Sequence, residues 1–217
     1  MFCESFWYPL YVFARRCGAD HQPAQDQVQD FLVEMVKQDL LAKADSQRGS
    51  FRSYLLGVFR NFLKKDYRKS QTQKRGGGFH ISSLEELTEE RFAAQPKTEL
   101  SPDIEFDRMW AAAILKHSVN RLREEYELAE RSELFTFLEP LLTGSAADRL
   151  SNLEISERLG ISVSGVGVSI HRMRRRFREI LRDEVSGTVG DKDELEEELA
   201  YLRGLFSVGT QSISPAP

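Results

Sequence analysis

The chain of 217 residues contains only two cysteines, four histidines and seven prolines, and it has no long apolar segment. Cys3 and Cys17 are too few for a four-ligand zinc site, and the four histidines, His21, His80, His117 and His171, are scattered along the chain. No apolar run approaches the roughly 18 residues of a membrane span. The aromatic N-terminus lacks the basic leader and small-residue cleavage site of a signal peptide. We therefore expect a cytoplasmic protein with reduced cysteines and no membrane insertion.

Sequence motifs for common enzyme chemistry are missing as well. The glycines at 76–78 follow a basic segment and not a strand, so they do not resemble a phosphate-binding loop. No His–Ser or His–Cys pair is placed by a motif, and no His, Cys or Asp cluster has metal-ligand spacing. The sequence thus predicts a protein that is not an enzyme, with no catalytic residue, no cofactor and no bound metal.

Charge is strongly segregated along the chain, although the net charge is only −4. Residues 60–75 contain seven basic side chains and one acid, and residues 171–182 contain His171, six arginines and one acid. Residues 85–107 instead carry eight acids against two basic side chains, and residues 191–198 carry six acids and one lysine. Two local basic patches on an acidic chain point to a polyanionic partner.

Apolar residues recur every three to four positions in the first third of the chain, which predicts three amphipathic helices. Their expected core stripes are Phe6, Leu10, Phe13 and Cys17; Val28, Phe31, Leu32, Met35 and Val36; and Phe51, Tyr54, Leu55, Val58, Phe59 and Phe62. A long helix is expected after Ser101, because Pro102 suits the first helical position. A further helix is expected at about 132–142.

Residues 151–182 fit a helix, a tight turn and a second helix. The first helix and the turn provide four expected packing positions, Leu153, Ile155, Leu159 and Ile161. Gly160 suits the left-handed residue at the end of that helix. The second helix packs through one stripe, Val166, Ile170, Met173 and Phe177. This is the layout of a helix-turn-helix, whose second helix enters the major groove of DNA.

The outward faces of this second helix carry the candidate contacts to duplex DNA. They are Ser164, Ser169, His171, Arg172, Arg175 and Arg176. The alternative is a helix whose arginines only keep it soluble. Such a helix pairs its charges at i,i+4, and the scarcity of acids here argues against that pairing. We therefore favour phosphate binding, which needs positive charge that is not already neutralised.

A second basic helix is expected at 51–69, with an aromatic face and a cationic face. Its candidate contacts to nucleic acid are Arg60, Asn61, Lys64 and Arg68. Aromatic side chains among cations can stack exposed bases while the cations hold the backbone. The alternative is that most of these aromatic side chains belong to the core.

Residues from about 6 to 185 resemble the bacterial RNA polymerase sigma factors of the sigma-70 family, extracytoplasmic-function (ECF) type. The segment that runs from "FWYPLYVFARRCG" through "AQDQVQDFLVEMV" to "FRSYLLGVFRNFLKKDYRKSQTQKRGGG" is similar to region two of these factors. The segment "ISERLGISVSGVGVSIHRMRRRFREIL" is similar to region four. The "KRGGG" run resembles a subgroup common in planctomycetes. The two segments in this order are more specific than either alone.

The resemblance implies an all-α fold with two small helical domains joined by a flexible acidic linker. Region two would be a three-helix domain at 1–75, the linker would cover 76–100, and region four with its helix-turn-helix would cover 101–185. Residues 186–217 would form an acidic tail with a short helix. We expect that helix to pack on region four; the alternative is that it covers the arginine helix.

The resemblance also implies a transcription initiation factor that directs core RNA polymerase to promoters. Region two would bind the clamp of the largest polymerase subunit through Asp26, Gln29, Asp30 and Glu34, and it would bind the −10 strand through the first basic helix. Region four would bind the −35 duplex and the polymerase flap. An anti-sigma factor is a further partner that the resemblance allows. The alternative is a stand-alone helix-turn-helix regulator, which would leave the region-two surfaces unexplained.

Overall fold

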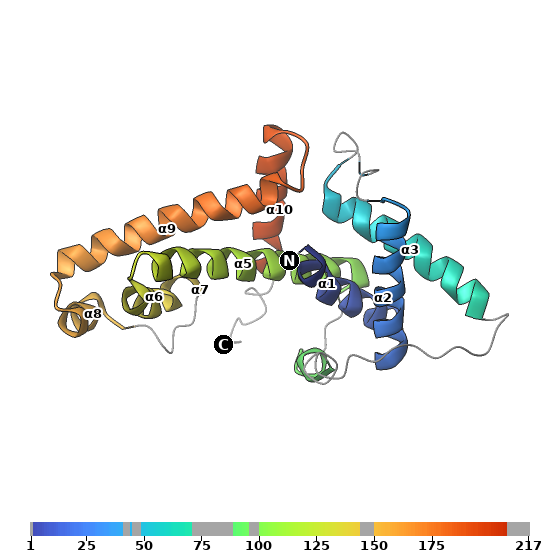
Figure 1. Ribbon diagram of the computed structural model, residues 1–217, viewed down its shortest axis with the longest axis horizontal. Coiled ribbons are helices and arrows are strands. Elements are labelled where there is room, and N and C mark those ends of the chain that lie inside the picture. Colours follow the sequence, from blue (N-terminus) through green and yellow to red (C-terminus); the bar gives the residue numbers. More distant parts are fainter. Residues whose placement is uncertain are drawn as a thin grey trace, which may run out of the picture. The chain divides into compact units, whose positions relative to one another are not determined.

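The computed structural model describes residues 2–40, 44, 49–70, 89–95, 100–143 and 150–207. All regular secondary structure in these ranges is helical, which confirms the predicted all-α fold (Figure 1). The chain divides into two compact units. Unit 1 consists of Met1–Ala113 and Val185–Pro217, and unit 2 of Ile114–Glu184. Two long helices, α5 (Pro102–Leu128) and α9 (Val163–Ser186), contribute residues to both units.

Unit 1 is built on the three helices predicted for the first third of the chain. These are α1 (Phe2–Arg16), α2 (His21–Lys37) and α3 (Phe51–Ser70), with α1 packed on α2 and α2 on α3. Their core is aromatic, because Phe31 and Phe59 are buried with ring centroids 4.8 Å apart. The start of α5 completes this core, since Trp110 stacks on Phe6 at 4.4 Å.

Two residues expected in the core of unit 1 lie on its surface instead. Cys17 is exposed just after the end of α1, and Val36 in the last turn of α2 is 69% exposed. Each is the last residue of its expected apolar stripe, and each lies in the last turn of its helix or just after it. The expected stripes are therefore correct along the helices and wrong at these two ends.

A short helical segment at 89–93 docks on α1. The Glu89 carboxylate pairs with Arg15 and accepts a hydrogen bond of 2.7 Å from the Tyr11 hydroxyl. Phe92 lies under the Arg15 guanidinium, with 4.5 Å from Cζ to the ring centroid. Burial, and then the hydrogen bond to Glu89, raise the pKa of Tyr11. The sequence predicted a linker at 76–100 with one short helical piece; residues 71–88 and 96–99 lie outside the described residues.

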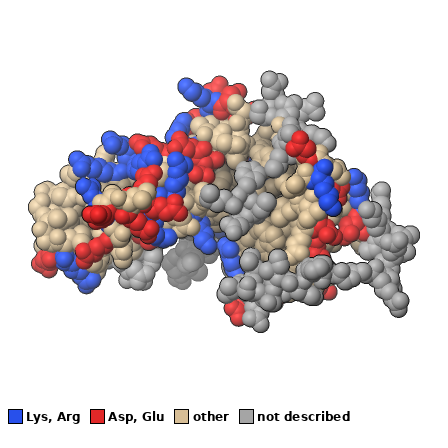
Figure 2. All heavy atoms as spheres, in the orientation of Figure 1, with Lys and Arg blue, Asp and Glu red and all other residues tan. Residues whose placement is uncertain are grey.

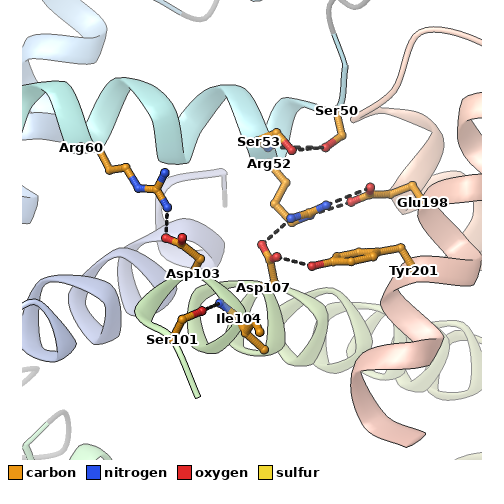
Figure 3. A network of polar contacts seen from close by, with 10 residues as sticks. All are labelled: Ser50, Arg52, Ser53, Arg60, Ser101, Asp103, Ile104, Asp107, Glu198 and Tyr201. Atoms are coloured by element: carbon orange, nitrogen blue, oxygen red, sulfur yellow. Dashed lines mark hydrogen bonds and ion pairs between the residues drawn. The ribbon is translucent and has the colours of Figure 1, made fainter. Parts of the chain in front are cut away.

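The C-terminal helix α10 (Lys192–Ser207) belongs to unit 1 and buries Leu195, Leu202 and Leu205. A buried arginine of α3 fastens it there (Figure 3). Arg52 donates to both carboxylate oxygens of Glu198, at 2.8 and 3.2 Å. In the described residues α10 therefore packs on α3 and also bonds Asp107 of α5, which lies within the residues 101–185 expected for region four. That α10 covers the arginine helix stays a prediction.

The same arginine also binds α5, so that one side chain links three helices of unit 1 (Figure 3). Arg52 pairs with Asp107, which in turn accepts a hydrogen bond from the Tyr201 hydroxyl. The Arg52 guanidinium lies 4.6 Å from the centroid of the Tyr201 ring. Burial lowers the pKa of Arg52, but the hydrogen bonds and charges of Glu198 and Asp107 together raise it above its usual value. The guanidinium therefore stays charged although it is 7% exposed.

Unit 2 contains α5 from Ile114 onward and α9 up to Glu184. It also contains α6 (Ser132–Leu138), α7 (Pro140–Thr143) and α8 (Asn152–Leu159). Its buried core consists of Val119, Leu122, Phe135, Leu138, Ile155, Val166, Met173 and Ile180. The single helix expected at 132–142 is divided before Pro140, because proline has no backbone N–H to continue the helix.

The predicted helix-turn-helix is confirmed by the caps of α8. Ser151 Oγ accepts from the Glu154 N–H at 3.2 Å, and the Glu154 carboxylate accepts from the Ser151 N–H at 2.8 Å. This reciprocal pair satisfies two N–H groups at the helix start. At the other end Gly160 has φ 64°, the left-handed conformation that the sequence predicted. Two expected packing residues are nevertheless exposed, Leu153 by 57% and Ile161 by 37%.

None of the described helices is both long enough and apolar enough to cross a lipid bilayer. The described residues also contain no group of three or more His, Cys, Asp or Glu side chains that could hold a metal ion.

Candidate nucleic-acid interface

The second helix of the helix-turn-helix, α9, has one buried side and one exposed side. Val166, Met173 and Ile180 are fully buried in the core of unit 2. On the opposite side Ser164, His171, Arg172 and Arg175 are all exposed, as the sequence predicted. Basic side chains gather over this helix on the surface (Figure 2). The exposed side of α9 therefore carries a row of positive charge, which suits a polyanionic partner.

Among the arginines that the sequence assigned to this face, Arg172 and Arg175 are exposed and Arg176 is only partly exposed. In the described part of the chain, Arg172 forms no ion pair. The Arg175 side chain is 67% exposed and lies 3.7 Å from the Glu179 carboxylate, a long contact between two exposed groups. Exposed pairs of this kind contribute at most about 1 kcal/mol, so a phosphate can replace Glu179 at small cost.

Arg176 differs from its neighbours because two carboxylates hold it within unit 2, although its side chain is 40% exposed. Its guanidinium donates to both oxygens of the Glu125 carboxylate, at 2.7 and 2.8 Å, and to Glu179 at 3.0 Å. The hydrogen bond from Arg176 lowers the pKa of Glu125, and the two carboxylates raise the pKa of Arg176. Arg176 therefore ties α9 to α5, and its charge is already neutralised.

This ion-pair pattern corrects one step of the sequence argument. Acids were expected to be too scarce around 171–182 to pair with the arginines, but Glu179 accepts from Arg176 and also lies next to Arg175. Ser169, another predicted contact, is half-buried, and its hydroxyl donates to the Gly165 carbonyl at 2.9 Å. The face available to DNA is thus narrower than the sequence indicated.

Exposed residues of α9 that the sequence reasoning missed include Val168, Arg174 and Arg178. Val168 is 49% exposed and lies between Ser164 and Arg172 at i,i+4 spacing. The end of α9 next to α8 forms an uncharged surface (Figure 2). The sequence reasoning assigned Val168 neither to the buried stripe nor to the outward face, and its exposure places it on the outward face.

The second predicted nucleic-acid surface lies on α3. Asn61 and Lys64 are exposed there, as expected. Arg60 is instead paired with Asp103 of α5 and lies 5.6 Å from the centroid of the Phe13 ring (Figure 3). The Arg68 side chain lies outside the described residues. Sequence reasoning missed Tyr67, which is 65% exposed and supplies an aromatic surface three residues after Lys64.

The residues proposed to bind the polymerase lie on α2. Asp30 is exposed, while Asp26, Gln29 and Glu34 are partly exposed. Glu34 accepts a hydrogen bond of 2.6 Å from the Gln38 side chain. Between these polar groups Val33 is 50% exposed and Val36 is 69% exposed, and neither was assigned to this surface from the sequence. The face therefore combines acidic and apolar groups.

Comparison with protein families gives a match over residues 14–183, to the family described as ECF sigma factor. The match includes α2, α3 and the helix-turn-helix, and it ends before α10. Among curated proteins and among solved structures, none matches the chain.

Proposed function

Because the chain belongs to the family of ECF sigma factors, we propose that it directs core RNA polymerase to specific promoters by binding the polymerase clamp, the −10 strand and the −35 duplex. Its membership of this family makes it a factor of transcription initiation that binds DNA and RNA polymerase. The family match spans residues from both compact units, and this single observation carries the proposal.

The helix α9 is the proposed reader of the −35 duplex. Its exposed Ser164, His171, Arg172 and Arg175 support this role, since an α-helix fits the major groove and arginine bonds both phosphates and base edges. Arg176 and Ser169 would act through other residues, because their polar groups are engaged inside unit 2.

The helix α3 is the proposed reader of the −10 strand. Asn61 and Lys64 would contact the backbone of the non-template strand, and Tyr67 would stack on an unpaired base. Capture of a flipped base offsets part of the energy of melting the duplex. Arg60 would exchange Asp103 for a phosphate, and Arg68 would extend the same basic surface.

The exposed face of α2 is the proposed contact with the polymerase clamp. Asp30 and Glu34 would meet basic side chains of the partner, and Val33 and Val36 would bury apolar area. Region four would in addition bind the polymerase flap. The protein would work in the cytoplasm as a binding factor without catalysis or cofactor, and an anti-sigma factor would compete for these surfaces.

Co-purification with sigma-free core polymerase tests this proposal. The intact chain should elute with the core enzyme in gel filtration, and Asp30→Lys should weaken the complex at least tenfold by placing like charges together. Glu197→Lys makes the same charge change on an exposed position of α10 and should leave the complex intact. If the intact chain shifts duplex DNA but never elutes with core polymerase, the regulator alternative is correct.

A further inference from the structure

The first part of α9 differs from the rest of the helix in having no charge. Residues 161–170 contain no acidic or basic side chain, and the first cation is His171. This end of the helix-turn-helix appears as an uncharged surface next to the basic one (Figure 2). In a helix-turn-helix the N-terminal residues of the second helix face base edges, while cations nearby hold phosphates. The uncharged part is therefore the part whose side chains determine specificity.

Val168 lies at the centre of the exposed stripe of α9. The stripe consists of Ser164, Val168, His171 and Arg175, spaced four, three and four residues apart, and all four are exposed. It runs opposite the buried Val166 and Met173. Val168 is thus the only apolar member of a stripe whose other described members are polar or charged. Its 49% exposure places its methyl groups at the surface that would meet a ligand.

Gly167, beside this valine, has no packing reason to be glycine. A Cβ built at Gly167 would meet no heavy atom of the described chain within 4 Å. A glycine inside a helix costs about 1 kcal/mol relative to alanine. At Gly165 the situation differs, since a Cβ would lie 3.2 Å from Ser162 Oγ. The missing side chain at 167 instead lets a large external surface approach the helix closely beside Val168.

We propose that Val168 contacts the C5-methyl group of a thymine in the major groove and so selects an A·T pair in the duplex element that α9 reads. The inference rests on the proposed function, because it requires α9 to lie in the groove of promoter DNA. Thymine is the base that offers an apolar group there, and a valine matches it. Arg172 and Arg175, one and two turns after Val168 along the helix, supply phosphate contacts beside it.

Replacement of single thymines by deoxyuridine tests this contact, because it removes the methyl group and keeps every hydrogen-bonding group. The preferred promoter is first selected from random duplexes with the full chain assembled on core polymerase. Each thymine of the upstream element is then replaced in turn. At one position the substitution should weaken binding by roughly fourfold, the effect of withdrawing one methyl group from water. Val168→Ala should bind more weakly and lose the sensitivity at that position only.

Two further variants serve as controls. Val163 is 45% exposed on the same helix but lies off the stripe, so Val163→Ala should keep the sensitivity to deoxyuridine. Arg172→Ala should weaken binding to the thymine and deoxyuridine duplexes equally. A selected element without thymine, or unchanged deoxyuridine sensitivity in Val168→Ala, overturns the thymine contact and leaves the proposed function standing. If the assembled protein selects no promoter at all, the proposed function fails together with the contact.

Discussion

Replacing Glu198 by alanine should destabilise unit 1 by about 2–3 kcal/mol, because Arg52 would lose one of its two buried carboxylate partners. Arg52 and Glu198 are 7% and 8% exposed, so neither is compensated by water. The substitution removes two hydrogen bonds to a charged group, at 2.8 and 3.2 Å. Asp107 would still bind the guanidinium. The cost is therefore below the roughly 3–5 kcal/mol expected for a buried charge left without any partner.

Urea unfolding followed by tryptophan fluorescence measures this effect selectively. Both tryptophans of the chain, Trp7 and Trp110, belong to unit 1. The signal therefore reports that unit and not the helix-turn-helix. Glu197→Ala, at the neighbouring exposed position of α10, is the matched control and should change the free energy of unfolding by at most about 0.5 kcal/mol.

The reasoning would be refuted if Glu198→Ala unfolded with the same midpoint and slope as Glu197→Ala. Arg52→Met provides a second reading of the same network. It leaves Glu198 and Asp107 as two buried carboxylates without their cation, and it should cost about 3–5 kcal/mol. A smaller effect for Arg52→Met than for Glu198→Ala would mean that the arginine does not hold the three helices together.

Three further predictions concern unit 2, and each is checked by far-UV circular dichroism during unfolding. Gly160→Ala should cost about 1–2 kcal/mol, because φ at this position is 64° and a side chain there is strained. Ser151→Ala should cost about 1 kcal/mol through loss of the cap shared with Glu154. The pKa of Glu125 is lowered by Arg176, so their pairing should be fully present above the unfolded pKa of about 4.3 and should be lost as the pH falls through the lower folded value. Glu125→Gln should remove that pH dependence; an unchanged acid transition would contradict the pairing.

Local patterns in the sequence were sufficient for most helices and for the helix-turn-helix. Periodic apolar residues located α1, α2, α3 and α9, and Gly160 ended α8 where a left-handed residue was required. These features depend on neighbours within a few residues, which a sequence displays directly. Pro140 also shows the limit of periodicity, since the apolar pattern continued across a position where the helix divides.

Contacts between distant segments could not be predicted in this way. Arg52 and Glu198 are separated by 146 residues, and an amphipathic acidic helix could pack equally well on either unit by its sequence pattern. The pairing of Arg176 with Glu125 spans 51 residues and removed one arginine from the expected DNA face. The exposure of Val36 was likewise hidden, because periodicity shows an apolar stripe but not where along the helix that stripe leaves the core.

Run-off transcription is the most direct test of the central claim that this chain selects promoters for RNA polymerase. The purified protein is added to sigma-free core polymerase on a library of genomic promoters, and the transcript starts are mapped. We expect starts that depend on the protein and lie downstream of one shared two-part motif, and these starts should weaken with Arg172→Ala. If no transcript start depends on the added protein, the chain does not act as an initiation factor under these conditions, and the account is contradicted.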